Sequence, residues 1–313
     1  MTGAERVAAT PEGGFDLEVG TLIVGAGACG LIAALAATEA GLEVLVIERD
    51  AVPSGSTALS AGLIPAAGTR WQRAAGIADS PEIFAADIMK KARGEPDPAL
   101  VAALTTGAAP VLEWLADRHG LPFSVVEDFD YPGHSRRRMH GLPTRAGREL
   151  IDALRAAAEA AGVEIATGRV VERLFAEGDL VTGAEARRGD GGAERIGCAR
   201  LILACNGFGG NPAMVRARMP GIGDALYFGH PGNRGDALVW GQALGAATRH
   251  LGAYQGHGNV AHPPGILITW AVIGAGGFQV NAEGNRFWNE SQGYSEAARA
   301  VLAAAQESGG QRP

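Results

Sequence analysis

The 313-residue chain holds only three cysteines, Cys29, Cys198 and Cys205, and their spacing matches no metal site. It matches no disulfide framework either, so the sequence predicts a protein without a bound metal, from a reducing compartment such as the cytoplasm. Cys29 lies in a glycine-rich turn and Cys205 ends an apolar run. Both are expected to serve as small packing residues.

The chain also lacks an excess of positive charge. Its 27 Lys and Arg residues are outnumbered by 34 Asp and Glu residues, which gives a net charge of −7. Nucleic-acid binding needs a basic surface, so the composition argues against a nucleic-acid partner. One short basic cluster, residues 136–138, is expected to be a solvated face, with attraction of an anionic substrate as the alternative.

Long hydrophobic runs are missing as well. The longest apolar stretch, residues 265–280, is interrupted by glycines and is too short to cross a bilayer comfortably. No segment has the pattern of a signal peptide, and residues 1–15 have the small, polar character of a flexible tail. We therefore expect a soluble cytoplasmic protein without a membrane span, built as one large α/β domain or as two domains.

Glycine is abundant, with 47 residues, and its positions organise the first part of the chain. Residues 19–24 are a short apolar run that leads directly into glycine, as a buried parallel strand does. Residues 29–40 carry apolar side chains at helical spacing and stop at Gly41, and residues 43–48 are a second apolar run. The order strand, glycine turn, helix and strand predicts a βαβ unit.

The middle of the chain continues the α/β pattern. Helices are expected at residues 81–93, 98–119 and 144–161, followed by a parallel strand at residues 163–167. Three short β segments then form an expected meander, and one more buried strand comes after them, at residues 169–175, 180–187, 193–198 and 200–205. The character of the sequence changes near residues 255–262, which predicts a second, substrate-side region from there.

The glycine turn itself carries a nucleotide-binding fingerprint. Gly25, Gly27 and Gly30 have the spacing G-x-G-x-x-G, between a predicted strand and a predicted helix. The first glycine allows the tight turn, the second lets the backbone approach a pyrophosphate, and the third lets helix and strand pack closely. Glu48 lies at the end of the second strand, where it can accept hydrogen bonds from a ribose. The alternative is a βαβ turn that binds nothing.

The segment after the second strand favours FAD over NAD. An NAD-dependent dehydrogenase would continue into further βα units, and that reading stays as an alternative. Here residues 54–62 form instead a loop of small, hydroxyl-bearing residues, Ser-Gly-Ser-Thr-Ala-Leu-Ser-Ala-Gly. Such a loop can lie along an extended cofactor and donate hydrogen bonds to its phosphates and ring edge.

With these residues, the sequence resembles the fumarate reductase and succinate dehydrogenase flavoprotein family, in its soluble branch with the 3-ketosteroid dehydrogenases. The resemblance covers nearly the whole chain. It rests on residues 25–48, 56–62, 204–211 (Ala-Cys-Asn-Gly-Phe-Gly-Gly-Asn), 235–236 (Gly-Asp) and 283–290 (Glu-Gly-Asn-Arg-Phe-Trp-Asn-Glu). It implies a Rossmann-like α/β FAD-binding domain with a β-meander over residues 16–255. Residues 256–313 would be the start of an inserted α+β capping domain.

The resemblance also implies the cofactor contacts. The residues expected to contact FAD are Gly25, Ala26, Gly27, Gly30, Glu48, Arg49, Ser56, Thr57, Ser60, Gly62, Val171 and Asp236. Membrane-bound members of the family attach FAD covalently through a histidine, and Ser56 occupies that position here. The resemblance therefore implies non-covalent FAD.

In this family, hydride moves between a C–C bond and the flavin while a side chain handles a proton. The resemblance implies that His262 and Thr269 hold a substrate carboxylate, with a turn-forming role for His262 as the alternative. Tyr294 stands where the dicarboxylate enzymes of the family have a catalytic arginine and where the ketosteroid dehydrogenases have a tyrosine. The resemblance therefore implies that Tyr294 carries the proton. The alternative is that Tyr294 only packs in the cap. The expected substrate is a small enoate, a keto-steroid or a related molecule. Arg286 is expected to brace the cap through an ion pair.

The family's flavin domain includes a second, C-terminal segment that residues 295–313 do not match. This predicts a truncated chain, and it leaves two readings open. One is an FAD-dependent oxidoreductase acting on a C–C bond next to a carbonyl or carboxylate, with an electron-transfer partner or a homo-oligomer. The other is a catalytically inactive nucleotide-binding remnant of such an enzyme.

Overall fold

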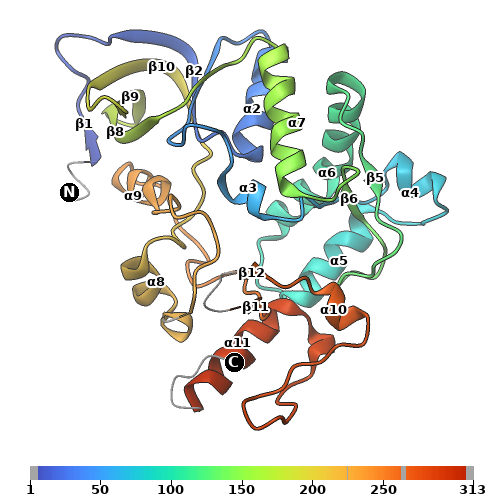
Figure 1. Ribbon diagram of the computed structural model, residues 1–313. Coiled ribbons are helices and arrows are strands. Elements are labelled where there is room, and N and C mark those ends of the chain that lie inside the picture. Colours follow the sequence, from blue (N-terminus) through green and yellow to red (C-terminus); the bar gives the residue numbers. More distant parts are fainter. Residues whose placement is uncertain (1–5, 224, 262–265, 308–313) are drawn as a thin grey trace.

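The computed structural model describes residues 6–223, 225–261 and 266–307 (Figure 1). The strands are β1 (Val7–Ala8), β2 (Leu17–Val24), β3 (Val44–Ile47), β4 (Ile64–Pro65), β5 (Ser124–Val125), β6 (Met139–Gly141), β7 (Glu164–Ala166), β8 (Arg169–Glu177), β9 (Leu180–Arg188), β10 (Ala193–Leu203), β11 (Val260–Ala261) and β12 (Ile266–Leu267). The helices are α2 (Ala28–Glu39), α3 (Gly55–Leu59), α4 (Arg70–Ala74), α5 (Pro81–Lys91), α6 (Pro98–His119), α7 (Gly147–Ala160), α8 (Pro212–Arg218), η1 (Pro220–Ile222), α9 (Asp236–Ala243), α10 (Ala271–Gly274), η2 (Glu290–Gln292) and α11 (Tyr294–Glu307).

The main sheet has the strand order β1-β8-β9-β10-β2-β3-β7. Strands β10, β2, β3 and β7 run parallel, and β8, β9 and β10 form the antiparallel meander. The predicted βαβ unit is present as β2-α2-β3, with the helix beginning at Ala28. The mixed α/β fold class and the meander are confirmed.

The two faces of the sheet are covered by different parts of the chain. Side chains alternate across a strand, so Ile23 of β2 faces one side while Leu22 and Val24 face the other. Ile23 belongs to a core cluster with residues of α2, α6 and α7, and Figure 1 shows α2 and α7 side by side. Leu22 and Val24 belong to a second cluster with residues of the meander and with Trp240 of α9.

Two of the long helices begin where the sequence signals place them. Ser80 caps α5 by accepting from the Ile83 amide at 3.3 Å, and Asp97 caps α6 by accepting from the Ala99 amide at 2.9 Å. Helix α6 ends at Gly120, which has a left-handed φ of 71°. Helix α7 begins at Gly147, three residues after the predicted start.

Among the described residues, one helix, α6, is long and apolar enough to cross a membrane by length and composition. The buried side chains of its inner face, Leu112 and Leu115 among them, belong to the core cluster shared with α2 and α7. Of its most apolar 18-residue window, 28% is buried, and one such helix is weak evidence of a membrane span.

The structure corrects three expectations about elements. Residues 7–8 do not belong to a loose tail, because they pair as β1 with β8, and the Phe15 ring packs over Gly183 and Gly197. The strands expected at 193–198 and 200–205 are one continuous strand, β10, whose first half pairs with β9 and whose second half pairs with β2. The hydroxyl-rich segment contains a short helix, α3, where a loop was expected.

The basic cluster at residues 136–138 is not a solvated face throughout. Arg138 is fully buried and forms ion pairs with Asp79 at 2.9 Å and Asp87 at 2.6 Å. A buried guanidinium needs such partners because an unpaired buried charge is very costly. Arg137 is exposed and pairs with Asp130. Arg138, the residue before β6, therefore joins that strand's start to α5 and to the segment before α5.

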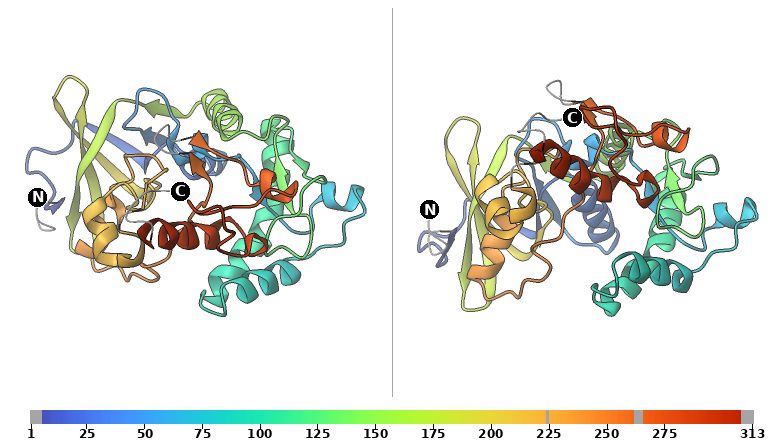
Figure 2. Two further views of the ribbon diagram at one scale, coloured as in Figure 1. Left: turned by 60° about the horizontal axis from the view of Figure 1, so that its bottom comes forward. Right: turned by 90° about the horizontal axis from the view of Figure 1, so that it is seen from below.

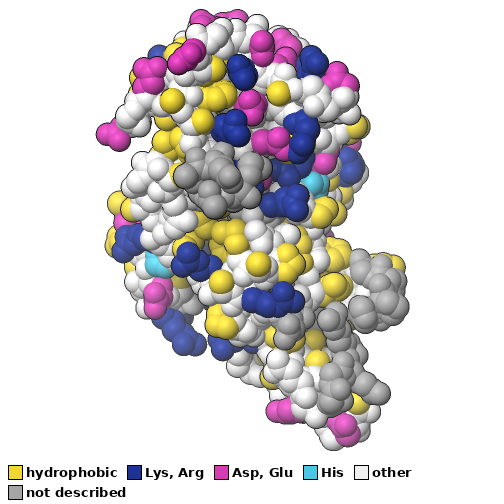
Figure 3. Space-filling model, turned by 90° about the vertical axis from the view of Figure 1, so that its left-hand side faces the viewer, with side chains coloured by type: hydrophobic (Ala, Val, Ile, Leu, Met, Phe, Trp, Pro, Cys, Tyr) yellow, Lys and Arg dark blue, Asp and Glu magenta, His cyan; other side chains and the backbone are white. Residues whose placement is uncertain are grey.

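Acidic and basic side chains also pair across the meander, as with Arg169–Glu194 and Arg173–Glu185. In the face seen in Figure 3, side chains of both signs are intermixed in the upper half of the view.

The last part of the chain lies against α5. Lys91 of α5 pairs with Glu296 at 2.5 Å and donates to the Gln292 carbonyl at 3.0 Å. Figure 2 shows α11 between the region of α8 and α9 and the helix α5.

Candidate functional site

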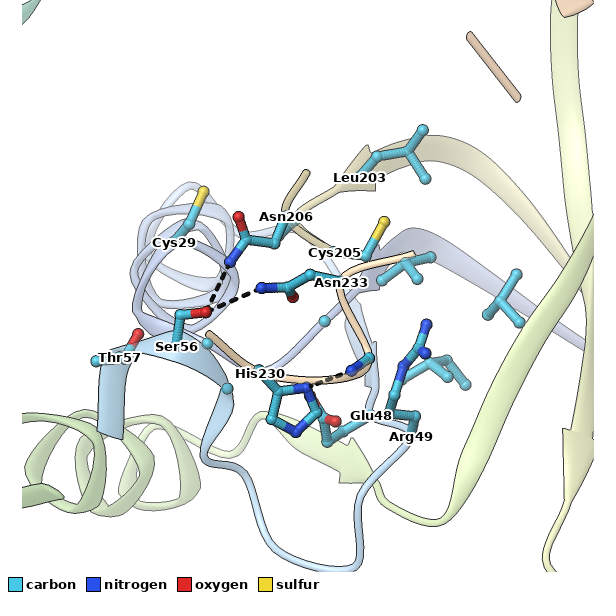
Figure 4. Close-up of a pocket in the computed structure, with 18 of the residues that line it drawn as sticks. Cys29, Glu48, Arg49, Ser56, Thr57, Leu203, Cys205, Asn206, His230 and Asn233 are labelled. Carbon is cyan, nitrogen blue, oxygen red and sulfur yellow. Dashed lines mark hydrogen bonds between the residues drawn. The ribbon is translucent and has the colours of Figure 1, made fainter. Parts of the chain in front are cut away.

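A cavity of about 410 Å³ lies at the carboxyl ends of β2, β3 and β10, where Val24, Ile47 and Leu203 contribute to its wall. Ligands of open parallel sheets bind at this edge, and the volume is typical of ligand pockets, roughly 300–1,000 Å³. The turn between β2 and α2 closes one side of the cavity, and Figure 4 shows the residues around it.

The glycines of the turn are required by close backbone contacts. Gly25 has a φ of 107°, and a Cβ placed on it would lie 2.6 Å from the Ala204 carbonyl oxygen. A Cβ on Gly30 would lie 1.9 Å from the Gly25 carbonyl oxygen. Gly27 precedes α2 and supplies no side-chain cap; the Ala28 amide donates to the Thr57 hydroxyl at 3.1 Å, and the amides of Cys29 and Gly30 in the same turn remain for a ligand. This is the geometry of an anion site at a helix N-terminus.

Glu48 is 8% exposed and lines the cavity at the end of β3. One of its carboxylate oxygens accepts from the Ala26 amide at 2.8 Å and the other from the Asp50 amide at 2.9 Å. Each oxygen has a further lone pair, so the carboxylate can also accept hydrogen bonds from a ribose.

Seven of the twelve predicted FAD contacts line this cavity: Gly25, Gly27, Glu48, Arg49, Ser56, Thr57 and Val171. The other five, Ala26, Gly30, Ser60, Gly62 and Asp236, are not part of its lining. Ala26 is fully buried, Gly30 packs on Gly25, and Ser60 and Gly62 pack against the beginning of α7. For all twelve residues, contact with the cofactor remains a prediction.

Asp236, at the start of α9, forms ion pairs with two neighbouring arginines. Its two carboxylate oxygens bind Arg6 at 3.1 Å and Arg49 at 3.2 Å. Arg49 lines the cavity, so Asp236 fixes a side chain of the site and ties the N-terminal segment to it.

The fold also brings to the cavity residues outside the twelve predicted contacts; Asn206 is one of them, from segment 204–211, whose backbone the family resemblance places at FAD. Asn206, His230 and Asn233 reach it from the segments after β10 and before α9, and Arg169 and Trp240 line it as well. Asn233 and Asn206 donate to the Ser56 hydroxyl at 3.0 and 3.2 Å (Figure 4). His230 pairs with Asp50 at 2.7 Å. Their spacing along the sequence carries no signal of a shared site.

Two cysteines also line the cavity. Cys29 is exposed, so the expectation of a packing role for it is wrong; its place inside the fingerprint is the signal that could have found it. Cys205 is half-buried, and burial together with the negative charge of Asp236 raises the pKa of its thiol. The Cys205 thiol is therefore protonated near neutral pH.

Tyr294 is the first residue of α11 and lies in a separate aromatic cluster. Its ring stacks on His257 with 5.2 Å between ring centroids and lies 6.2 Å from Trp270. Gln255 donates to its hydroxyl oxygen at 3.0 Å. Burial lowers the pKa of His257, so this ring is neutral near pH 7. His257 and Gln255 are partners of Tyr294 that sequence reasoning missed.

Of the two predicted substrate residues, Thr269 is exposed and its hydroxyl accepts from the Ala271 amide at 3.3 Å. His262 lies outside the described residues. The expected ion pair of Arg286 is present and joins it to Glu290.

Comparison with known proteins gives consistent results. The profile of the FAD binding domain family matches residues 20–313. The NADH:fumarate oxidoreductase of Klebsiella pneumoniae (strain 342) is 28% identical over 306 residues, which are 97% of this chain and 33% of that protein. A probable fumarate reductase of Shewanella frigidimarina (strain NCIMB 400) is 32% identical over 286 residues, which are 90% of this chain and 48% of that protein.

Solved structures agree. The open conformation of a flavocytochrome c3 fumarate reductase has a TM-score of 0.83 at 31% identity, covering 93% of this chain and 51% of that one. A 3-ketosteroid-Δ4-(5α)-dehydrogenase from Rhodococcus jostii RHA1 has a TM-score of 0.80 at 25% identity, covering 97% of this chain and 70% of that one.

The chain thus spans about a third to a half of the length of these curated relatives. The fingerprint turn and the buried Glu48 fit a dinucleotide, and the profile match along residues 20–313 identifies that dinucleotide as FAD. The chain belongs to the FAD-binding domain family, among the fumarate reductases and related flavoproteins.

Proposed function

We propose that this chain is the flavin-binding part of an oxidoreductase that moves hydride between FAD and a C–C bond next to a carbonyl or carboxylate. The observation that carries the proposal is the cavity at the β2–α2 turn, which has a nucleotide fingerprint and a buried carboxylate in place. Relatives named as a fumarate reductase, an acrylate reductase and a 4-oxocyclohexanecarboxylate 2-dehydrogenase support this substrate class, because the three named substrates share a carboxylate.

Residues of the cavity can be assigned to parts of the cofactor. Glu48 is proposed to hold a ribose, and the first turn of α2 is proposed to hold the pyrophosphate. Ser56 and Asn206 lie on the wall across from Arg49 (Figure 4). FAD, when bound, supplies a ring that accepts or donates hydride at N5.

Tyr294 is the proposed proton carrier. The Gln255 amide donates to its oxygen, so the phenolic hydrogen is free to point toward a substrate. The neutral His257 ring stacked on Tyr294 holds its orientation without adding a charge. Thr269 and His262 remain the proposed contacts of the substrate carboxylate.

FAD is proposed to bind non-covalently, because the position of the family's attachment histidine holds Ser56, a wall residue of the cavity. Protein saturated with FAD should be yellow, and acid precipitation should leave the flavin in the supernatant. Flavin retained in the washed pellet would contradict the non-covalent assignment. Protein that stays colourless with excess FAD would overturn the whole proposal.

The proton role is tested by Tyr294→Phe. Each FAD-loaded protein is reduced without oxygen, and fumarate, acrylate or 4-androstene-3,17-dione is added while flavin absorbance is followed. Reoxidation by one of these substrates should slow about 100-fold or more in the variant, with an unchanged flavin spectrum, since proton transfer of this kind contributes about 10²–10⁴-fold. The exposed Tyr254→Phe is the matched control.

Full activity of Tyr294→Phe would show that a group other than Tyr294 transfers the proton. If no substrate reoxidises the wild-type flavin, the alternative of a catalytically inactive FAD-binding chain is favoured.

A further inference from the structure

The Ser56 hydroxyl, on the wall of the FAD cavity, is held by two amides from distant segments. Asn233 donates to its Oγ atom at 3.0 Å, and Asn206 donates at 3.2 Å (Figure 4). Ser56 is half-buried in α3, Asn206 follows β10, and Asn233 precedes α9. Three separate segments therefore converge on one hydroxyl oxygen.

The direction of these hydrogen bonds is fixed by their neighbours. The Oδ1 atom of Asn206 accepts from the Gly207 amide at 2.9 Å, so its NH₂ group must face Ser56. Asn233 also donates to the Tyr227 hydroxyl at 2.7 Å, and that hydroxyl donates to the His230 carbonyl at 3.3 Å. A flip of the Asn206 amide would place its NH₂ group against the Gly207 N–H, and Asn233 donates to the Tyr227 hydroxyl because the hydrogen of that hydroxyl is directed to the His230 carbonyl.

This arrangement leaves the hydrogen-bond donor of the Ser56 hydroxyl unused. A hydroxyl has two acceptor lone pairs and one hydrogen, and both lone pairs are occupied by the two amides. Within residues 6–223, 225–261 and 266–307, no hydrogen bond has the Ser56 hydroxyl as its donor. Because Ser56 lines the cavity, its hydrogen is available to a ligand there.

We propose that Asn206 and Asn233 are positioning residues that commit Ser56 to donate a hydrogen bond to FAD. The atom of FAD opposite Ser56 is then an acceptor, either a phosphate oxygen in the ADP half or a nitrogen or oxygen in the flavin half. Two accepted N–H bonds also polarise the hydroxyl and make it a stronger donor. The proposal rests on FAD binding by this chain, which wild-type protein tests separately.

The test is a double-mutant cycle on FAD affinity. Ser56→Ala should raise the Kd for FAD about tenfold, the value expected for loss of one hydrogen bond at a partly charged acceptor. Asn206→Gly should raise it in the same direction, because the hydroxyl is then free to turn its hydrogen away. In the Ser56→Ala background, Asn206→Gly should change the Kd less than about twofold, since an effect through Ser56 needs that hydroxyl.

The variants suit this purpose. Asn206 is exposed and has a φ of 66°, a conformation that glycine adopts without strain, so the fold should be retained. Asn206→Asp is a more stringent variant, because its carboxylate would accept the hydrogen of the Ser56 hydroxyl. It should raise the Kd for FAD at least as much as Ser56→Ala. The exposed Ser124 of β5 supplies the matched serine control, Ser124→Ala.

ADP as a second ligand identifies the acceptor. If Ser56→Ala weakens ADP as much as FAD, the acceptor lies in the ADP half; if only FAD is weakened, it lies in the flavin half. An unchanged Kd for FAD in Ser56→Ala, or additive effects of Ser56→Ala and Asn206→Gly, would overturn the proposal. Failure of the wild type to bind FAD would instead overturn the proposed function.

Discussion

Single atoms decide whether the fingerprint turn can form. A Cβ at position 30 would lie 1.9 Å from the Gly25 carbonyl oxygen, far inside van der Waals contact, whereas a Cβ at Gly107 of α6 meets nothing within 4 Å. We expect Gly30→Ala to destabilise the protein by more than about 2 kcal/mol and to abolish FAD binding, because backbone must move. Urea unfolding and FAD titration measure both effects.

Gly107→Ala is the control for the same substitution in a helix. Alanine is favoured over glycine in a helix interior by about 1 kcal/mol, so this variant should be neutral or more stable, with FAD affinity unchanged. Equal changes in the free energy of unfolding and in FAD affinity at positions 30 and 107 would show that the close contact at Gly30 does not decide whether alanine is tolerated there.

Glu290 gives the cap a pH-dependent contact. The ion pair with Arg286, with help from the Gln279 amide, lowers the pKa of Glu290 to about 2. Its pKa is lower in the folded than in the unfolded chain, so its stabilising effect is full above the unfolded value, roughly 4.3. That effect is lost as the pH falls toward the folded value.

We expect Glu290→Gln to lower Tm by several degrees at pH 7, and the difference from wild type to shrink steadily below about pH 4.5. Thermal melts from pH 7 to 3 measure this, with the exposed Glu283→Gln as control. A Tm difference that is constant across this range would contradict the assignment.

At the scale of elements, the buried Arg138 joins three segments through Asp79 and Asp87 and stacks over the Phe84 ring at 4.7 Å. Arg138→Met removes the cation and leaves two carboxylates without their partner, one of them fully buried. Such broken pairs typically cost about 3–5 kcal/mol. The neighbouring, exposed Arg137→Met should cost less than about 1 kcal/mol.

Equilibrium unfolding of the two methionine variants compares them directly. Similar free energies of unfolding for both would show that the Arg138 cluster contributes no more than a surface pair.

Elements whose signals are local were predictable from the sequence. The βαβ unit follows from apolar runs on either side of a glycine turn, and α5 and α6 follow from Ser80 and Asp97 with a proline after each. The pairing of β1 with β8 and the burial of Arg138 depend on partners far along the chain. No local pattern encodes such partners, so these features were missed.

At the scale of the whole molecule, the site also contains residues that the sequence predicts and residues that it does not predict. Gly25, Glu48 and Ser56 belong to one continuous stretch of sequence, and their place at the cavity was foreseeable. Asn206 and Asn233 reach Ser56 only because β10 lies beside β2 in the sheet, which brings the ends of both strands to one edge. The sequence holds both amides but does not say that they meet.

The pairing of β2 with β10 also sets an order of events during protein synthesis. Val24 pairs with Leu203, and the Gly25 turn packs on Ala204, so the fingerprint is complete only after about 180 further residues have been added. At roughly 5–20 residues per second, a ribosome needs about 9–36 s for that stretch. The turn is synthesised early but can be assembled only after β10 has been made, and FAD can be captured only by a chain that already carries its meander.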